Sequence, residues 1–512
     1  MQDRLETCVS QHTSCRQDDP IAPTRLIDVE CPDQSLVRLV QTNGGRLGRY
    51  MALSYCWGTD ENYKTTEAMI PSMEMGFPLL CLPKAVQDAI YIARKLHIRH
   101  IWVDALCIIQ DSPNDWLTES SSMSTVYQNA FLTLAASSAN SASSGFLQDY
   151  DTKSSRNTFS LPWVNDDGSL SEAKARIIPE HHWPTRYALD NRAWALQEAL
   201  LSTRLLMFTP REIRWECKET AGCECRPSTQ HAYQQTSPFN LQTSQEAGAY
   251  WRNIVKGYTQ RAMRNPQDKL PAIAGIARIL QPLLGPNYIA GLWRNTLMWD
   301  LTWKTSGAWN PTPKPSEEYI APTFSWASMT TAVDYEYTEF NDFVEKGDVL
   351  NAQSSQSSVP GQLAFGRVSS GSLQLRGYLY HTKFDGLEEG ENSYPWETVR
   401  NIRLAGVNRR FFPDVMIDSF TFINSKGQSA VAVSRLRPGY TLNRWTIGLP
   451  VTVFYLGYVS IEGDQVKQIF LCLGRSPQNP EFYERLGCIA FDNSRRPDFP
   501  IREWEAETIT LV

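Results

Sequence analysis

The chain has 512 residues, of which 42% are hydrophobic and 20% are charged, and its formal net charge is −6. A chain of this length exceeds one ordinary hydrophobic core, so we expect two or three domains. Its 49 basic residues do not outnumber its 55 acidic ones, which argues against a nucleic-acid partner, because such proteins carry a basic patch.

The chain begins with the polar run MQDRLETCVSQHTSCRQDD, which lacks the apolar stretch of a secretory signal. No segment reaches the roughly 20 uninterrupted apolar residues that a membrane-spanning helix needs. The 11 cysteines are scattered and odd in number, which fits reduced thiols better than a disulfide framework. We therefore expect a cytoplasmic protein with no membrane span.

The N-terminal part is expected to hold a β-hairpin. Residues 1–24 show no clear periodicity and are expected to be irregular. Residues 26–30 and 35–41 are apolar, β-branched runs separated by Cys-Pro-Asp, a pattern that predicts two strands joined by a turn.

Strands and helices then alternate. Residues 50–56, 100–104 and 131–136 are short, mostly apolar runs that predict strands. Apolar residues recur at helical spacing between these runs, which predicts helices near 83–97 and 113–129. This order indicates right-handed crossovers and a parallel sheet.

The pattern downstream is mixed. A helix is expected over 191–200, and the polar stretch 354–358 within NAQSSQSSVPG is the best candidate for a linker or long loop. The other expected elements are helices around 246–261 and 270–284, and strands at 205–208, 213–216, 362–379, 430–434, 451–460 and 466–473.

Three sequence blocks resemble the heterokaryon-incompatibility (HET) family: YMALSYCWG at 50–58, LPKAVQDAIYIARKLHIRHIWVDALCIIQDSPNDW at 82–116 and RAWALQEALLSTR at 192–204. MSTVYQNAFLTLAASSANSASSGFL at 123–147 is similar to the middle segment of that family. The resemblance implies a fungal protein of non-self recognition or regulated cell death. It also implies a sheet similar to that of Toll/interleukin-1 receptor (TIR) domains, some of which cleave NAD.

The resemblance divides the chain and sets its expected fold class. The expected parts are an N-terminal extension with a β-hairpin at 1–49, a HET domain at 50–198, a mixed helical and strand region packed on it at 199–350, and a β-rich C-terminal region at 351–512. The HET domain is expected to be α/β, with a TIR-like or flavodoxin-like parallel sheet and flanking helices. The rest is expected to be mixed α+β and rich in strands.

Side chains at the carboxyl ends of two predicted strands are the first site candidates. Asp104 ends one strand, and Ser54, Tyr55, Trp57 and Gly58 lie at the end of the other, where open α/β sheets bind ligands. In the functional interpretation Asp104 is a catalytic carboxylate, Trp57 stacks on a ring and Gly58 lets a backbone approach closely. In the structural interpretation Trp57 packs over the sheet, Gly58 makes a turn and Asp104 caps the next loop.

Glu119 is the second catalytic candidate. It lies one turn into the helix expected near 113–129, with Trp116 as a neighbour on the helix surface. A carboxylate there could stabilise the positive charge that develops when an N-glycosidic bond breaks. The resemblance implies this role, because NAD-cleaving TIR domains use a glutamate on the corresponding helix, after a tryptophan. The alternative is a solvated glutamate that interacts favourably with the helix dipole.

Arg192, Trp194 and Glu198 complete the candidate ligand-binding set. Trp194 and Glu198 are four residues apart and share a face of the predicted helix, whereas Arg192 points elsewhere. The structural alternative is that Trp194 docks the helix and Glu198 pairs with a basic neighbour such as Arg204.

No metal site is expected. Cys217, Cys223, Cys225 and His231 are close in sequence, but they lack the paired Cys-x-x-Cys spacing of structural zinc sites. Cys107 is expected to be a buried small hydrophobe and not a nucleophile.

Two functions from different classes follow. The first is a HET-type effector or regulator of fungal incompatibility that acts by self-association or by binding a protein partner. The second is an enzyme, either an NAD glycohydrolase that uses Glu119 or a HET-fold catalyst recruited to a biosynthetic pathway. No cofactor is firmly implied, and NAD enters only as a substrate of the second function.

Overall fold

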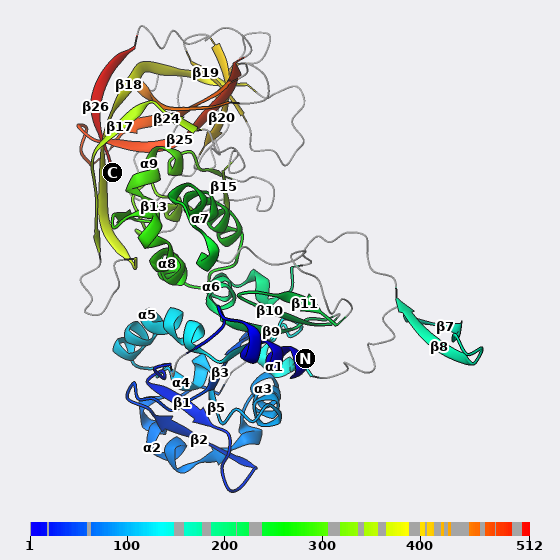
Figure 1. Cartoon of the computed structure of the whole chain (residues 1–512). Helices are drawn as coiled ribbons and strands as arrows, with labels where there is room; N and C mark the ends of the chain where they lie inside the picture. The colour runs from blue at the N-terminus through cyan, green and yellow to red at the C-terminus, as the bar shows by residue number, and fades with distance from the viewer. Residues whose placement is uncertain are drawn as a thin grey trace. The chain divides into compact units, whose positions relative to one another are not determined.

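The structure of the protein is a computed structural model that describes most of the chain. The described residues are 2–17, 20–58, 63–147, 158–176, 186–210, 212–224, 238–305, 318–335, 343–356, 365–388, 400–404, 407–413, 421–423, 429–431, 450–460, 466–476, 478–493 and 504–512. The chain divides into two compact units, Met1–Ser237 and Pro238–Val512 (Figure 1).

The first unit is built around a nine-stranded sheet. Its strands are β1 (Arg25–Asp28), β2 (Leu36–Gln41), β3 (Tyr50–Ser54), β4 (Phe77–Pro78), β5 (His100–Trp102), β6 (Leu132–Ala135), β9 (Arg204–Phe208), β10 (Ile213–Cys217) and β11 (Ala221–Cys223). Their order in the sheet is β11-β10-β9-β6-β3-β5-β1-β2-β4. Two further strands, β7 (Thr158–Val164) and β8 (Leu170–Arg176), pair with each other as a separate antiparallel hairpin.

The centre of the sheet is parallel, as the sequence predicts. β3 pairs in parallel with both β5 and β6, so that Met51 lies opposite Ile101 on one side and Leu132 on the other. β6 pairs in parallel with β9. Outside this centre the strands are antiparallel, because β1 runs back along β5 and β10 runs back along β9. The sheet as a whole is therefore mixed, with a flavodoxin-like order in its parallel part.

Helices cover both faces of the parallel centre. The helices of the first unit are α1 (Gln2–Gln11), α2 (Ile70–Met75), α3 (Lys84–Lys95), α4 (Asp104–Cys107), α5 (Pro113–Asn129) and α6 (Ala193–Leu201). α3 packs on β3 and β5, and α5 packs against α6. The connection through α3 crosses the sheet in one direction and the connection through α5 crosses it in the other. Right-handed crossovers then put α3 and α5 on opposite faces.

The apolar pattern explains why α3 lies on the sheet. Its buried face includes Val86, Ala89, Ile90 and Ala93, which recur at the three- and four-residue spacing of one helical stripe. The prediction of helices near 83–97 and 113–129 is confirmed.

The prediction that residues 1–24 are irregular is wrong, because residues 2–11 form α1. Cys8 is buried and Leu5 and Val9 are partly buried against the same core, so the apolar stripe of α1 has only three residues within a mostly polar run. The hairpin that follows is confirmed, since β1 and β2 pair antiparallel with Leu26 opposite Val40. It does not stand apart from the following domain, because β1 also pairs with β5.

A buried carboxylate ties three segments of the sheet together. Asp28 in β1 accepts hydrogen bonds from Arg38 in β2 and from Arg99 beside β5, each at 2.9 Å. Burial raises the pKa of Asp28, but hydrogen bonds from Arg99, the Glu30 backbone N–H and Arg38 outweigh it and lower the pKa to about 2. The carboxylate is therefore ionised in the folded protein at neutral pH.

The second unit starts with helices and short strand pairs. These elements are α7 (Ser244–Thr259), α8 (Ala274–Leu284), α9 (Leu297–Asp300), β12 (Tyr288–Ile289), β13 (Leu292–Trp293), β14 (Lys304–Thr305) and β15 (Val333–Asp334). Trp251 and Trp326 both donate their indole N–H to the Gly291 carbonyl oxygen, at 3.0 and 2.8 Å. Gly291 has φ +95°, and a Cβ there would lie 2.7 Å from the Trp326 nitrogen, so the position requires glycine.

Among the helices that the structure describes, none combines the length and apolar character needed to cross a lipid bilayer.

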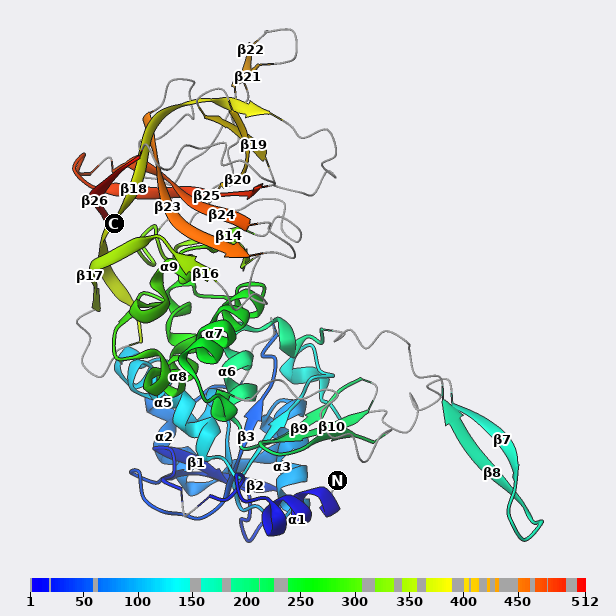
Figure 2. The same ribbon diagram turned by 45° about the horizontal axis from the view of Figure 1, so that its top comes forward.

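The remainder of the second unit is rich in strands, as predicted (Figure 2). The strands are β16 (Phe343–Glu345), β17 (Gly347–Gln356), β18 (Val368–Glu388), β19 (Arg400–Leu404), β20 (Val407–Pro413), β21 (Thr421–Ile423), β22 (Ser429–Val431), β23 (Pro450–Ser460), β24 (Val466–Arg475), β25 (Tyr483–Asn493) and β26 (Glu505–Leu511). The antiparallel pairings β18–β19, β19–β20, β20–β25, β25–β24, β24–β23 and β23–β18 form a closed ring. The long strand β18 also pairs with β17 and β26.

The expectation of a linker at 354–358 is wrong for its described part. Ser354, Ser355 and Gln356 belong to β17, where they pair with β18. The backbone pairing with β18 includes these residues although their composition is typical of a loop. Residues 357–358 lie outside the described residues, as do residues 362–364 and 432–434 of two predicted strands that otherwise overlap β18 and β22.

The first prediction concerns the core beside β5. Val103 has no exposed surface, so Val103→Asp would bury a charge without a partner and should cost about 3–5 kcal/mol. Thermal unfolding of the full chain, followed by circular dichroism, measures the effect. Leu80→Asp is the control, because Leu80 is 82% exposed and should tolerate the charge. A Val103→Asp protein with the parent's melting temperature would contradict this placement.

The second prediction concerns acid stability. The folded-state pKa of Asp28 lies below its ordinary value of 3.8, so its stabilisation is present above that pH and is lost as the pH falls toward 2. A shift of this size corresponds to about 2 kcal/mol. Asp28→Asn should therefore be less stable than the parent at pH 7, and the gap should narrow below about pH 4. Urea unfolding of both proteins over a pH series tests this prediction. A difference in unfolding free energy between parent and variant that does not change with pH would refute it.

Candidate functional site

β3 and β6 are neighbours in the sheet, and the chain leaves their carboxyl ends in opposite directions. The chain leaves β3 toward β5 on one side and leaves β6 toward β9 on the other. Ser54 at the end of β3 lies opposite Ala135 at the end of β6. Doubly wound sheets bind ligands in the crevice that forms at such a divergence. The sheet therefore has its natural binding position at this edge.

Asp104 begins α4 just after β5, and two donors hold its carboxyl group. Its Oδ2 accepts a hydrogen bond from Trp57 Nε1 at 2.9 Å, and its Oδ1 accepts one from the Ala105 backbone N–H at 2.7 Å. Burial raises the pKa of Asp104, while Arg192, Trp57 and the Ala105 N–H favour the ionised form. The structure thus brings Trp57 and Asp104, from the ends of neighbouring strands, into direct contact.

Arg192 and Glu198 reach the same edge from α6. Arg192 donates a hydrogen bond to the Tyr55 carbonyl oxygen, and the Ser54 hydroxyl donates one to Glu198. Arg192 is the N-cap residue of α6 and has an extended backbone, with φ −85° and ψ 130°. The helical-face argument that separated it from Glu198 therefore does not apply to it. We call Ser54, Tyr55, Trp57, Asp104, Arg192 and Glu198 the carboxyl-edge cluster.

The cluster combines two carboxyl groups with one guanidinium. Burial raises the pKa of Glu198, which is 2% exposed, and Arg192 and the Ser54 hydroxyl oppose that rise. Burial lowers the pKa of Arg192, but Glu198 and Asp104 raise it by more. Arg192 is thus the shared counter-charge of both carboxyl groups.

Tyr127 in α5 adjoins this cluster and was not a site candidate. Its hydroxyl donates a hydrogen bond to the Leu53 carbonyl oxygen at 3.1 Å. Burial raises its pKa well above the ordinary value, and the charges of Glu198 and Asp104 add to that effect. The apolar stripe of α5 marks Tyr127 as a core residue, but no pattern in the sequence shows where its hydroxyl ends.

Gly58 makes a turn in which its neighbours leave no room for a side chain. Its φ is +76°, and a Cβ there would lie 2.5 Å from the Ser141 Cβ. The Ala142 backbone N–H donates to the Trp57 carbonyl oxygen at 3.3 Å, which holds the same turn closed. These contacts match the structural interpretation of Gly58.

Glu119 lies in a different group of charges. Arg25 in β1 reaches Asp115 at 2.6 Å and Glu119 at 3.4 Å, and Arg25 Nε donates to the Cys107 carbonyl oxygen at 2.7 Å. Glu119 is 2% exposed, so it is not the solvated glutamate of the structural alternative. Burial raises its pKa, while Thr24 and Arg25 favour its charged form. Arg25 and Asp115 were not site candidates. The sequence shows that Arg25 is a charged residue beside an apolar strand, but it does not show that Asp115 in α5 is its partner.

The remaining candidates pack on the hydrophobic core. Trp116 and Trp194 are partly buried against the core of the first unit. Arg204, the basic neighbour expected for Glu198, instead donates to Gln17 Oε1 at 3.0 Å and to the Cys15 carbonyl oxygen at 2.6 Å.

One cysteine near this region, Cys107, is a buried thiol, whereas Cys217 and Cys223 lie at the ends of two strands. Burial raises the pKa of the Cys107 thiol to about 12, which suits a buried hydrophobe and not a nucleophile. Cys217 ends β10 and Cys223 ends β11, whereas Cys225 and His231 lie outside the described residues. Cys217 approaches His12, with 3.4 Å between Sγ and Nδ1.

The geometry limits what the carboxyl-edge cluster can do chemically. Asp104 and Trp57 are each partly exposed, and the Lys64 ammonium lies over the Trp57 ring, 5.3 Å from its centroid. A ring that stacked on the Trp57 indole would share that side chain with Lys64 and lie beside the Asp104 carboxyl group. Glu198 is 2% exposed, so a ligand at this edge would not contact it directly. A carboxyl group with a raised pKa can donate a proton, and in its ionised form it can stabilise a cation. The cluster therefore suits a ligand that combines a flat ring with hydroxyl groups or positive charge.

A protein-family model matches the part of the chain that contains this cluster. The family model described as heterokaryon incompatibility protein (HET) matches residues 50–198. That range runs from the first residue of β3 to Glu198 in α6, and so contains the whole carboxyl-edge cluster. Searches of curated proteins and of solved structures found no match, so the likeness to TIR domains stays a prediction. Residues 50–198 of this protein therefore match the HET domain of the heterokaryon-incompatibility family.

Proposed function

We propose that this protein acts in fungal non-self recognition, and that its HET domain promotes regulated cell death by binding a protein partner or a second copy of itself. The observation that carries the proposal is the HET match over residues 50–198, which spans the parallel centre of the sheet from β3 to α6. The carboxyl-edge cluster supplies the surface for this role.

The cluster has the residue types and the rigidity of an interface centre. Tryptophan and arginine contribute most to protein interfaces, and both occur here, partly exposed, as Trp57 and Arg192. The Asp104 carboxyl group fixes the Trp57 indole, and the Tyr55 carbonyl fixes the Arg192 guanidinium. Side chains held in one conformation lose little entropy when a partner binds, so such contacts are strong for their size.

The third prediction tests this surface. Trp57→Ala should weaken partner binding or self-association by about 2 kcal/mol, roughly a thirtyfold loss of affinity. Hyphae that express the full chain should then survive, as measured by exclusion of a vital dye. Light scattering of the purified protein reports self-association directly.

Tyr91→Ala is the matched control, because Tyr91 is an aromatic residue on α3 that is 53% exposed. It should leave both readouts unchanged. Melting temperatures show whether each variant folds. If Trp57→Ala folds and still kills hyphae as efficiently as the parent, the proposed surface is refuted.

A second candidate function, cleavage of NAD, is favoured by the placement of Asp104. Departure of nicotinamide leaves positive charge on the ribose, and a carboxylate held in a shielded site stabilises that charge. Asp104 is partly exposed and lies against Trp57, on which the nicotinamide or adenine ring would stack. Glu119, which the TIR resemblance favours, is enclosed and already paired with Arg25.

The fourth prediction separates these two carboxylates. In a nicotinamide-release assay at high protein concentration, Asp104→Asn should reduce turnover by about 10²–10³-fold. Glu119→Gln should keep turnover close to that of the parent. If Glu119→Gln lost turnover and Asp104→Asn kept it, Glu119 would be the catalytic carboxylate. If the assembled parent protein released no nicotinamide, NAD cleavage would be refuted, and the proposed binding function would be unaffected.

A further inference from the structure

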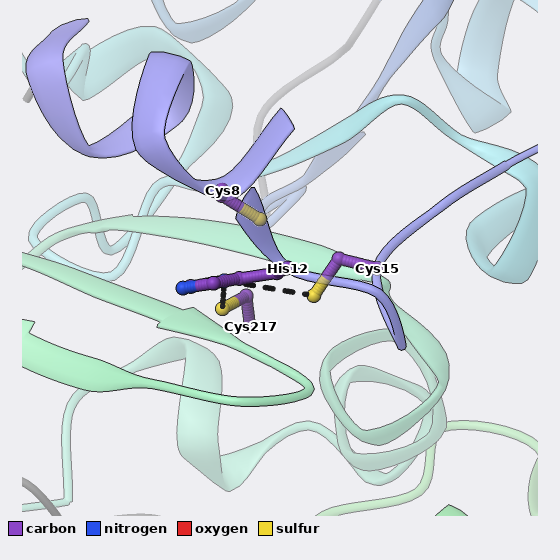
Figure 3. A group of neighbouring side chains, drawn as sticks. All are labelled: Cys8, His12, Cys15 and Cys217. Carbon is purple, nitrogen blue, oxygen red and sulfur yellow. Dashed lines mark hydrogen bonds between the residues drawn. The ribbon is translucent and has the colours of Figure 1, made fainter. Parts of the chain in front are cut away.

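Four side chains that are metal ligands in many proteins meet in the first unit, away from the carboxyl-edge cluster. They are Cys8, His12, Cys15 and Cys217, and their ligand atoms all lie within 4.8 Å of one another (Figure 3). Three of the four side chains are buried, and His12 is partly exposed. Cys8 lies in α1, His12 and Cys15 lie just beyond it, and Cys217 ends β10.

The distances match those of a tetrahedral zinc site. Zinc bound by sulfur at about 2.3 Å and by nitrogen at about 2.1 Å sets a sulfur–nitrogen separation of about 3.6 Å. His12 Nδ1 lies 3.4 Å from Cys217 Sγ and 4.0 Å from Cys15 Sγ, on either side of that value. Small side-chain movements would therefore complete the coordination.

Local structure presents each group toward the others. Cys8 and His12 are four residues apart, so they project from one face of the N-terminal helix. The His12 N–H still donates to the Cys8 carbonyl oxygen at 3.3 Å, which continues the helical turn. Cys217 lies in a tight turn where the Thr220 backbone N–H donates to its sulfur at 3.3 Å. Such N–H donors to sulfur are a regular feature of the shell around zinc-bound cysteines.

We propose that Cys8, His12, Cys15 and Cys217 bind one zinc ion. Binding would release the three thiol protons to solvent and use the neutral imidazole, so three thiolates and one nitrogen surround the metal. All four positions of the tetrahedron come from the protein. No position is left for water or substrate, so the site is structural and not catalytic.

The alternative for three neighbouring cysteines is a disulfide. In this structure Cys8, Cys15 and Cys217 are all reduced. A disulfide would use two of them and would leave the third sulfur and His12 with no reason to converge. Zinc uses all four groups at once.

Zinc at this position would fasten the N-terminal segment to the sheet. Other contacts already join the two, since Ser14 N–H donates to Glu219 Oε1 at 2.7 Å and Arg4 donates to the Cys223 carbonyl oxygen at 3.2 Å. The metal would close a chain segment of about two hundred residues between Cys15 and Cys217, and closure of a long segment removes much entropy from the unfolded chain.

The fifth prediction is the metal content of the full chain. Protein purified without a histidine tag, under reducing conditions, should contain about one zinc per chain by mass spectrometry of the metal. Cys217→Ser and His12→Ala should lose most of it. Cys223→Ser, in the same hairpin but outside the four-residue group, should keep it.

His12→Cys keeps the test decisive if the other variants do not fold, because a thiolate can replace the imidazole as a ligand. This variant should retain zinc.

The cobalt-substituted parent should show tetrahedral visible bands and thiolate charge-transfer absorption, and His12→Cys should strengthen the charge-transfer absorption. Chelation should lower the melting temperature by several degrees and speed hydrogen exchange in α1 while α3 stays protected.

Three results would overturn the proposal. The first is a parent protein that neither contains zinc nor takes it up when zinc is supplied under reducing conditions. The second is a Cys217→Ser protein with the zinc content of the parent. The third is a disulfide between two of the three cysteines in the purified, metal-free protein.

Discussion

Arg192 is the positive charge that acts on two carboxyl groups, Glu198 and Asp104, at the carboxyl edge of the sheet. A carboxylate buried without a counter-charge costs several kcal/mol, which Arg192 offsets for both Glu198 and Asp104. If the guanidinium were removed, these groups would have to bind protons or turn toward solvent. The hydrogen bonds from Ser54 to Glu198 and from Trp57 to Asp104 would then weaken, and with the first of them one link between α6 and β3.

A second arginine performs the same task at the other end of α4. Arg25 neutralises Asp115 and Glu119 and also binds the Cys107 carbonyl oxygen, so it connects β1, α4 and α5. This residue precedes the region that matches the HET family. The matched region therefore shares its sheet and one of its charge clusters with the hairpin that precedes it.

The zinc site that we propose would extend this connection to the first residues of the chain. α1 packs on the core through Cys8, which is buried, and through Leu5 and Val9, which are partly buried. Hydrogen bonds from Arg204 to the Cys15 carbonyl oxygen and from Gln17 to the Ala130 carbonyl oxygen fix the segment after it. A metal at Cys8, His12, Cys15 and Cys217 would add to these contacts.

The sequence by itself determined the alternation of strands and helices between residues 50 and 136, because apolar periodicity reports which face of an element is buried. The resemblance to the HET family over residues 50–198 was also visible in the sequence, as were Asp104 and Trp57 at the ends of two predicted strands. It missed α1, whose apolar stripe is limited to Leu5, Cys8 and Val9 within a mostly polar run. It assigned part of β17 to a linker because backbone pairing leaves no mark on side-chain composition.

Only the tertiary structure decided which charges and ligands meet. Arg192 joins Asp104 because an N-cap residue has an extended backbone and leaves the helical face, which no spacing rule shows. Cys217 lies beside Cys8, His12 and Cys15 and not with its sequence neighbours, because the sheet brings β10 to the N-terminal helix. Periodicity acts over a few residues, whereas these contacts join segments that are one or two hundred residues apart, and only the packed sheet sets their distance.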